Sequence, residues 1–330
     1  MASLFILFAT ALIGAVLYAV RHNTENLAVF PVNQEVKEER PEPASPEKNG
    51  GYANPDALIG VHELHEKIFS DPGIFTIDTR GRTYRVFKNS YPIGHIPGAA
   101  PLLYKRYCHP TYAGRMASPL QLQNILREIG VRNDSCIVLY GNDGLQARLY
   151  WAIKMYGHTN VKILDGGFDI WKEAGYEIAT ANSTRPSGDF EFDLTQSNIE
   201  TMLATIDEVK ASVGDRNSVI LDARSPNEHQ TGSVPGSENI HCQELLNTDG
   251  TFKPAPELEE IFMSKQINRD KKVIVYSNNG VRSSLVWFAL SELLGYPNVK
   301  NYDGSYQEWV NEKAQMGKDQ KGNVLDDQKE

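Results

Sequence analysis

The sequence predicts an α/β protein with two tandem domains, each a central parallel sheet flanked by helices. Three observations support this fold class. The chain repeats itself in order, its strand-like runs are continuously apolar, and those runs alternate with helix-like segments. Continuous apolar runs are typical of strands that helices cover on both faces, which is the arrangement of parallel sheets.

The internal repeat defines the two copies. Residues 157–171 match residues 295–309 at a constant offset of 138 positions, from Gly157 to Gly295. Three further pairs match in the same order, namely residues 75–80 with 219–224, 95–99 with 233–237, and 136–144 with 272–280. A period this long indicates a duplicated domain rather than a short structural repeat.

The second copy is the clearer of the two for individual elements. Strands are expected at residues 219–222, 273–276 and 299–302, and helices at residues 256–265 and 283–294. Ligands of parallel sheets bind beyond the carboxyl ends of strands. The loop after Tyr276 and its counterpart after Tyr140 lie at such ends and are therefore candidate ligand-binding sites.

Composition limits the function classes. The 330 residues carry a formal net charge of −9, with a pI near 5.5, which gives no electrostatic support for nucleic-acid binding. The three cysteines, Cys108, Cys136 and Cys242, form no CxxC pair and no metal-ligand spacing, so we expect no metal and no cofactor. Cys136 and Cys242 are expected to be packed thiols.

The remaining segments divide by composition. Residues 3–20 carry no charge and predict a membrane anchor, with a cleaved signal segment as the alternative. Arg21 and His22 follow this run, which favours the cytoplasmic face for the domains over a periplasmic or exported location. We further expect a disordered spacer at 21–56, a first domain at 57–179, a linker at 180–200, a second domain at 201–316 and a flexible tail at 317–330.

The loop after Tyr276 has the features of an anion site. Ser277, Asn278, Asn279 and Gly280 link a buried strand to the apolar helix that follows Val281 and Arg282. Such a loop directs backbone N–H groups and the positive end of a helix dipole toward one point. Arg282 adds a fixed positive charge.

These motifs resemble the tandem rhodanese family, the thiosulfate and 3-mercaptopyruvate sulfurtransferases, over about residues 57–315. The resemblance rests on Asp222-Ala-Arg224-Ser-Pro-Asn-Glu228, on the run from Gly232 to Ile240, on the loop 277–282, and on the run from Asp303 to Trp309. It implies a non-catalytic first domain and a second domain in which a loop cysteine carries sulfane sulfur as a persulfide. The implied partners are a small sulfur-containing anion and a thiophilic acceptor such as a protein thiol.

The chain departs from the family pattern at three positions. Ser277 stands where the family places its cysteine, and serine cannot form a persulfide. Asn279 stands where thiosulfate-specific relatives have a lysine, and Gln196 lies near the position of a substrate-binding arginine. The first-copy loop has Gly141 at the corresponding position and so has no nucleophile either.

Two functions therefore remain open. One is a sulfurtransferase whose activity Ser277 impairs, whether the serine is natural or introduced. The other is a catalytically inactive, membrane-anchored rhodanese module that binds an anion or a protein partner. A phosphatase-like use of the loop ranks last because it also needs a cysteine. Asp222 with Arg224, and Asp78 with Arg80, are expected to form structural ion pairs, with Glu228 part of the second-copy network.

Overall fold

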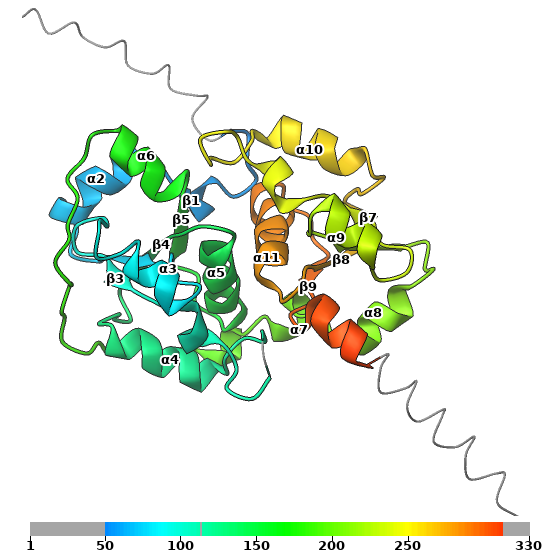
Figure 1. The fold of residues 1–330 in the computed structure, drawn as a ribbon, viewed down its shortest axis with the longest axis horizontal. Coiled ribbons are helices and arrows are strands. Elements are labelled where there is room, and N and C mark those ends of the chain that lie inside the picture. Colours follow the sequence, from blue (N-terminus) through cyan, green and yellow to red (C-terminus); the bar gives the residue numbers. More distant parts are fainter. Residues whose placement is uncertain (1–49, 113, 313–330) are drawn as a thin grey trace, which may run out of the picture. The chain divides into compact units, whose positions relative to one another are not determined.

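Two parallel sheets form the framework of the protein, one in each copy (Figure 1). The structure is a computed structural model, and it describes residues 50–112 and 114–312. The first copy contains η1 (Pro55–Ala57), β1 (Leu58–Ile59), α2 (Val61–Ser70), β2 (Ile74–Asp78), α3 (Tyr84–Lys88), β3 (Ala100–Pro101), η2 (Tyr104–Tyr107), α4 (Pro119–Glu128), β4 (Cys136–Tyr140), α5 (Leu145–Met155), β5 (Val161–Leu164) and α6 (Gly167–Glu173).

The second copy contains η3 (Leu194–Gln196), α7 (Ile199–Met202), α8 (Ile206–Ser212), β6 (Ser218–Asp222), α9 (Pro226–Thr231), β7 (Glu238–Asn239), η4 (Cys242–Leu245), α10 (Ala255–Met263), β8 (Lys272–Tyr276), α11 (Val281–Phe288), a π-helical turn η5 (Ala289–Leu293) and β9 (Val299–Asn301). From α8 to β9 the second copy repeats the order of elements that the first copy has from α2 to β5, but among the described residues it has no strand corresponding to β1. Residues 305–312 are also helical.

The sheets confirm the predicted fold class. The first has the order β1-β5-β4-β2-β3 and the second the order β7-β6-β8-β9, and all the paired strands are parallel. In β4, Ile137 and Leu139 belong to one buried cluster, while Val138 and Tyr140 belong to another. Because successive side chains of a strand point to opposite faces, both faces of this sheet are covered, as the continuous apolar run predicted.

The repeat places equivalent residues at equivalent ends of the two sheets. Asp78 of β2 pairs in register with Tyr140 of β4, and Asp222 of β6 pairs with Tyr276 of β8. The loop that begins at Ser277 therefore leaves the carboxyl edge of the second sheet, beside the carboxyl end of β6.

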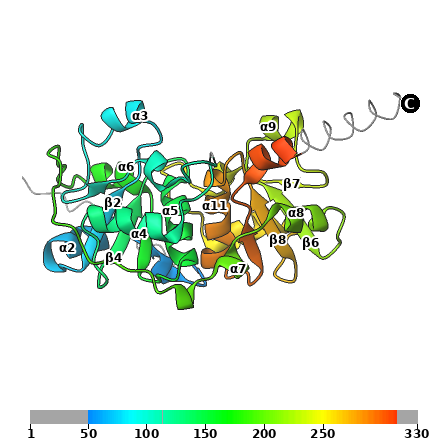
Figure 2. The same ribbon diagram turned by 90° about the horizontal axis from the view of Figure 1, so that it is seen from below.

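The two copies share a core through α5 and α11, which lie side by side in both views (Figures 1 and 2). The rings of Tyr150 and Phe288 meet edge to face, with centroids 4.9 Å apart. One buried cluster contains residues of both copies, so the first copy packs directly against the helix that follows the candidate loop.

The helix after the loop differs from its predicted range. The sequence predicted one helix at residues 283–294, but α11 begins at Val281 and gives way to η5 at Ala289. A π-helical turn keeps apolar side chains on the helix, so hydrophobic periodicity does not distinguish it from α-helix.

The end of the predicted disordered spacer is ordered instead. In residues 50–56, the Ala53 N–H donates to the Leu293 carbonyl at 2.7 Å, and the Tyr52 hydroxyl donates to the Lys253 carbonyl at 3.1 Å. The prediction failed here because it followed composition, whereas Tyr52 packs against the common core. The rest of the predicted spacer and the predicted tail lie outside the described residues.

The predicted membrane localisation is corrected. In residues 50–112 and 114–312, no helix has both the length and the apolar character that a membrane span requires. Residues 3–20, on which the prediction depended, lie outside the described residues.

Candidate functional site

The candidate loop joins β8 to α11, and Gly280 sets its shape. Gly280 has a φ of +75°, in the left-handed region that favours glycine. A Cβ atom at this position would also overlap Nη1 of Arg148 and approach the backbone of Asp303. Both the backbone angle and the space around it therefore require glycine at the point where the loop turns into the helix.

Ser277 occupies the first position of the loop and is fully buried. Its N–H donates to Oγ of Ser305 at 3.2 Å, and its carbonyl accepts from the N–H of Tyr306 at 2.9 Å. Its own Oγ lies 3.4 Å from Oγ of Ser283, and this is the hydrogen-bond contact of the Ser277 hydroxyl among the described residues. A serine hydroxyl needs an adjacent general base to become a nucleophile, and another serine does not supply one.

The backbone of the loop keeps its N–H groups available. From Asn278 to Arg282, no N–H has a hydrogen-bond acceptor among the described residues, although Gly280 and Val281 are buried. The first N–H groups of a helix have no acceptor within the helix, so this loop offers unpaired donors at the N-terminus of α11, where an anion can bind.

The loop side chains have separate environments. Val281 is fully buried in the shared core, so it contributes through its N–H and through packing. Asn278 is exposed, and its carbonyl accepts from the N–H of Gln307 at 3.2 Å. The side chain of Asn279 reaches the first copy, where its amide nitrogen donates to the hydroxyl of Tyr104.

Arg282 does not offer a free charge to the loop. Its Nη1 and Nη2 donate to the two carboxylate oxygens of Glu228 at 2.6 and 2.8 Å. The Arg282 guanidinium is the main cause that lowers the pKa of Glu228 to about 2, with further lowering from Ser225. The sequence placed Glu228 in the network of Asp222 and Arg224. The structure pairs it with Arg282 and, through the cap of α9, with Ser225.

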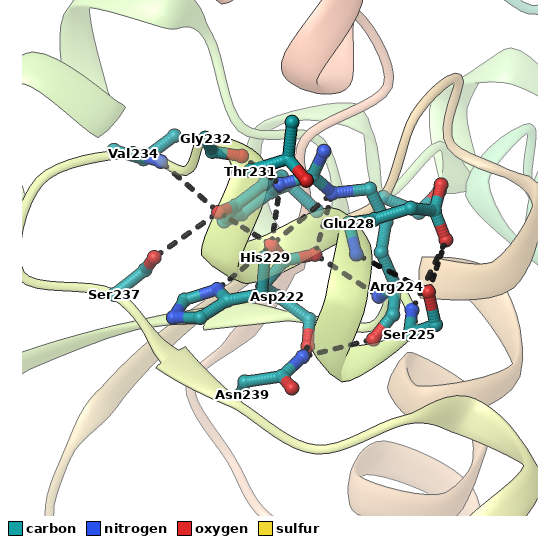
Figure 3. A network of polar contacts seen from close by, with 12 residues as sticks. Asp222, Arg224, Ser225, Glu228, His229, Thr231, Gly232, Val234, Ser237 and Asn239 are labelled. Atoms are coloured by element: carbon teal, nitrogen blue, oxygen red, sulfur yellow. Dashed lines mark hydrogen bonds and ion pairs between the residues drawn. The ribbon is translucent and has the colours of Figure 1, made fainter.

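The network around Asp222 supports the edge of the sheet (Figure 3). Asp222 is fully buried and accepts from Arg224 at 2.7 Å, from the Tyr276 hydroxyl at 2.9 Å and from Nδ1 of His229 at 3.0 Å. Arg224 also donates to the Gly232 carbonyl. The first copy repeats this arrangement, since Arg80 donates to Asp78 at 2.6 Å and to the Gly94 carbonyl at 2.7 Å. Each ion pair braces a strand end and the loop that follows it.

Side chains of Arg148, Tyr104 and Arg82 in the first copy reach the candidate loop, and the sequence analysis missed them. The Arg148 guanidinium is fully buried, lies against Gly280 and forms an ion pair with Asp303. Tyr104 accepts from Nδ2 of Asn279 at 3.3 Å, and Arg82 approaches Oδ1 of the same residue at 3.5 Å. The repeat could not reveal them, because it aligns each copy with the other and contains no information about which surfaces of the copies meet.

Gln196, the third predicted departure, lies away from the loop. It ends the short turn η3 and sits beside Gly157 of the first copy. Among the described residues, no hydrogen bond or ion pair joins Gln196 to residues 277–282. The structure thus does not bring Gln196 together with the other candidate site residues.

The first-copy loop has an acidic environment. A cavity of about 420 Å³ opens beside Gly141 and Gly144, and its lining includes Asp143, Asp169 and Asp249. Carboxylates repel anions, so this cavity is unsuited to the ligand that the second-copy loop would take.

The cysteines do not replace the missing nucleophile. Burial raises the pKa of Cys108, Cys136 and Cys242, to about 11 for Cys242. Thiolates are the reactive form, so these side chains are poor nucleophiles near neutral pH. Within the described residues, no group of His, Cys, Asp and Glu side chains could hold a metal ion.

Comparisons with known proteins agree with this geometry. A family model for the Rhodanese-like domain matches residues 61–174 and 205–312. The sulfur carrier protein TtuD of Thermus thermophilus is 32% identical over 279 residues, which cover 79% of this chain and 96% of the relative. A putative thiosulfate sulfurtransferase of Haloferax volcanii is 34% identical over 284 residues, which cover 80% and 96%.

A solved structure shows the same arrangement of domains. The structure of SseA from Escherichia coli, described as a 3-mercaptopyruvate sulfotransferase, matches with a TM-score of 0.69 and 28% identity. The match covers 76% of this chain and 98% of SseA. With its two parallel sheets and its loop at the carboxyl edge of the second one, this chain belongs to the rhodanese family and contains two rhodanese-like domains in tandem.

Proposed function

We propose that this protein binds a small sulfur-containing anion reversibly at the loop from Ser277 to Arg282 and forms no persulfide there. The unpaired N–H groups of this loop, at the N-terminus of α11, carry the proposal. They do not depend on the side chain at position 277, so the exchange of cysteine for serine leaves an anion site without its nucleophile.

The chemistry of sulfur transfer explains why the exchange matters. In a reaction with thiosulfate, a thiolate attacks the outer sulfur, a new S–S bond forms, and sulfite leaves with the electron pair of the broken bond. Ser277 has no thiolate, and its neighbour Ser283 cannot remove its proton. The chain therefore keeps the ligand class of sulfurtransferases, named in its relatives, while the covalent step is impaired.

A sulfurtransferase activity would need a different nucleophile in this site. Among the native thiols, Cys108 is the one in contact with Tyr104, the first-copy residue that bonds to the loop, and it is half-buried. Its Sγ donates to the Tyr104 carbonyl at 3.2 Å, and burial raises its pKa. The residues at the loop therefore provide no nucleophile that could transfer sulfur to a protein thiol or to cyanide.

Titration of the protein with thiosulfate tests the proposal. We expect millimolar-range binding, equivalent to roughly 4 kcal/mol, with NMR shifts at the amide of Gly280 and none at Gly141 of the first-copy loop. Sulfate serves as a control for an unreactive anion of similar charge. The mass of the protein recovered after dialysis should be unchanged. Shifts confined to Gly141, or no shift at Gly280, would show that the loop does not bind anions.

A further inference from the structure

Arg82 differs from the other arginines around the candidate loop in its lack of a counter-ion. Arg282 pairs with Glu228, Arg224 with Asp222, Arg115 with Glu308, and Arg148 with Asp303. No carboxylate of residues 50–112 or 114–312 forms a salt bridge with Arg82, which is half-buried beside the loop. A partly desolvated guanidinium without a counter-ion is a binding position for an anionic group.

The contacts of Arg82 hold it at the loop without using its charge. Its Nη2 lies 3.5 Å from Oδ1 of Asn279, at the long limit for a hydrogen bond. Its guanidinium carbon lies 5.8 Å from the ring centroid of Tyr104, whose hydroxyl accepts from the other end of the Asn279 amide. One loop side chain thus positions both first-copy residues, and most of the guanidinium donors stay available.

The sequence around Arg82 offers it no nearby carboxylate. From Thr79 to Ser118 the chain contains no Asp or Glu, but it contains seven Lys and Arg residues. The whole chain has a formal charge of −9 and this stretch +7, so the remaining residues carry −16. Arg80, Arg106 and Arg115 of this stretch form ion pairs with carboxylates outside it, whereas no salt bridge of the described residues includes Arg82.

From these observations we propose that Arg82 binds a second anionic group of the ligand that occupies the loop. The ligand class is a small molecule with a sulfur-containing anionic group at one end and a carboxylate at the other. The sulfur group lies at the N–H groups of residues 278–282, and the carboxylate pairs with Arg82. This inference rests on the proposed function, because it needs an anion at the loop.

A purely structural role for Arg82 makes a different prediction. If the side chain only braces Asn279, its removal disturbs the loop and lowers the affinity for every anion that binds there by a similar factor. If Arg82 binds a carboxylate, its removal lowers the affinity only for those ligands that carry a carboxylate. Two probe molecules that differ by a carboxylate separate the two roles.

The experiment compares sulfoacetate with methanesulfonate by calorimetry at constant ionic strength. Wild type should bind sulfoacetate roughly tenfold more tightly, the scale of one charge-assisted hydrogen-bonded pair. Arg82→Gln should lose this preference and keep its affinity for methanesulfonate within about twofold. Arg82→Lys should keep part of the preference. Arg85→Gln is the matched control, because Arg85 is exposed on α3 and has no contact with the loop among the described residues.

The outcomes separate the two proposals. Equal affinities of wild type for the two probes would overturn the role of Arg82 and leave anion binding at the loop intact. A similar loss of affinity for both probes in Arg82→Gln would show that Arg82 only supports the loop structure. A preference that Arg85→Gln removes as well would reflect the general positive field rather than Arg82. No binding of either probe to wild type would reject the proposed function itself.

Discussion

Glu228 determines how much positive charge the loop offers to a ligand. It holds both terminal nitrogens of Arg282, so the loop's own cation is neutralised before any anion arrives. The sequence showed Arg282 beside the loop but not its partner, because Glu228 lies 54 positions earlier. An anion at the proposed site would therefore be held mainly by N–H groups, or it would displace Glu228.

Glu228→Gln should strengthen the binding of thiosulfate. The substitution removes a negative charge beside the loop and leaves Arg282 free to face the ligand. We expect roughly a fivefold gain in affinity, equal to about 1 kcal/mol for a charge pair in solvent-like surroundings. Calorimetric titration of both proteins measures this gain. Glu244→Gln, an exposed carboxylate that caps η4, is the control and should leave the affinity unchanged. A weaker affinity in Glu228→Gln would mean that the carboxylate orients Arg282 for binding.

The same residue predicts how stability depends on pH. Its folded-state pKa, about 2, lies below the ordinary value of 4.5. The contribution of the pair is therefore present above 4.5 and is lost as the pH falls toward 2. The difference in unfolding free energy between wild type and Glu228→Gln should be constant from pH 7 to pH 5 and should shrink at lower pH. Urea denaturation across this range measures it, and a difference that grows on acidification would contradict the pairing.

Gly280→Ala should destabilise the protein and abolish binding at the loop. An alanine there must adopt the φ of +75°, and its Cβ would overlap the buried guanidinium of Arg148. We expect a loss of at least about 1 kcal/mol from the backbone, and more from the overlap. Gly214→Ala is a control, because Gly214 has a φ of +79° and an alanine Cβ there would have no atom within 4 Å. Similar losses in the two variants would show that Arg148 does not restrict position 280.

At the scale of elements, α9 connects the sheet edge to the loop. Ser225 caps this helix in a reciprocal capping box with Glu228, and the same Glu228 carboxylate holds Arg282. A six-residue helix depends strongly on such a cap, since few of its backbone groups are paired internally. The cap therefore helps to fix the position of the Glu228 side chain.

Ser225→Ala should cost about 1 kcal/mol of stability, the usual value of an N-cap. It should also loosen Glu228, so that the affinity for thiosulfate rises slightly. Thiosulfate titration and thermal unfolding measure the two effects. Thr231→Ala at the other end of α9 is the matched control, because its hydroxyl donates only to the Asn227 carbonyl of the preceding turn. Equal losses of stability in the two variants would show that the capping box does not stabilise α9 more than the Thr231 hydrogen bond does.

The elements differ in how well sequence predicted them. The strand that ends at Tyr276 was predicted within one residue, because its apolar run has a single interpretation once the repeat is recognised. The π-helical turn after Phe288 and the ordered residues 50–56 were not predicted, since both depend on packing against distant parts of the chain. The loop residues were identified, whereas Arg82, Tyr104 and Arg148 were not, because they approach the loop only through the contact between the copies.

At the scale of the whole molecule, the two copies share the largest buried cluster, and side chains of both meet at the candidate loop. The first copy has no nucleophile in its own loop, yet it supplies the side chains that surround the loop of the second. A second copy produced alone would therefore lack Arg82, Tyr104 and Arg148 at the loop.

Residues 50–54 should stabilise the second copy from outside both repeats. Their backbone and side chains bond to Leu293, Lys253 and Glu292. A chain without residues 1–49 should unfold cooperatively, whereas a chain without residues 1–54 should be less stable by roughly 1–3 kcal/mol, the value of a few hydrogen bonds. Thermal denaturation of the two truncated proteins measures the difference. Equal stabilities would mean that these contacts add nothing to the fold.

The most direct test of the proposed anion site is mass spectrometry of wild type and Ser277→Cys after incubation with thiosulfate. If the loop is an intact anion site that lacks only its nucleophile, wild type should gain no sulfur. Ser277→Cys should gain one sulfur atom, mapped to the peptide that contains position 277, because the loop N–H groups favour a thiolate. A sulfur adduct on wild type, or no adduct on a folded Ser277→Cys protein, would contradict this proposal.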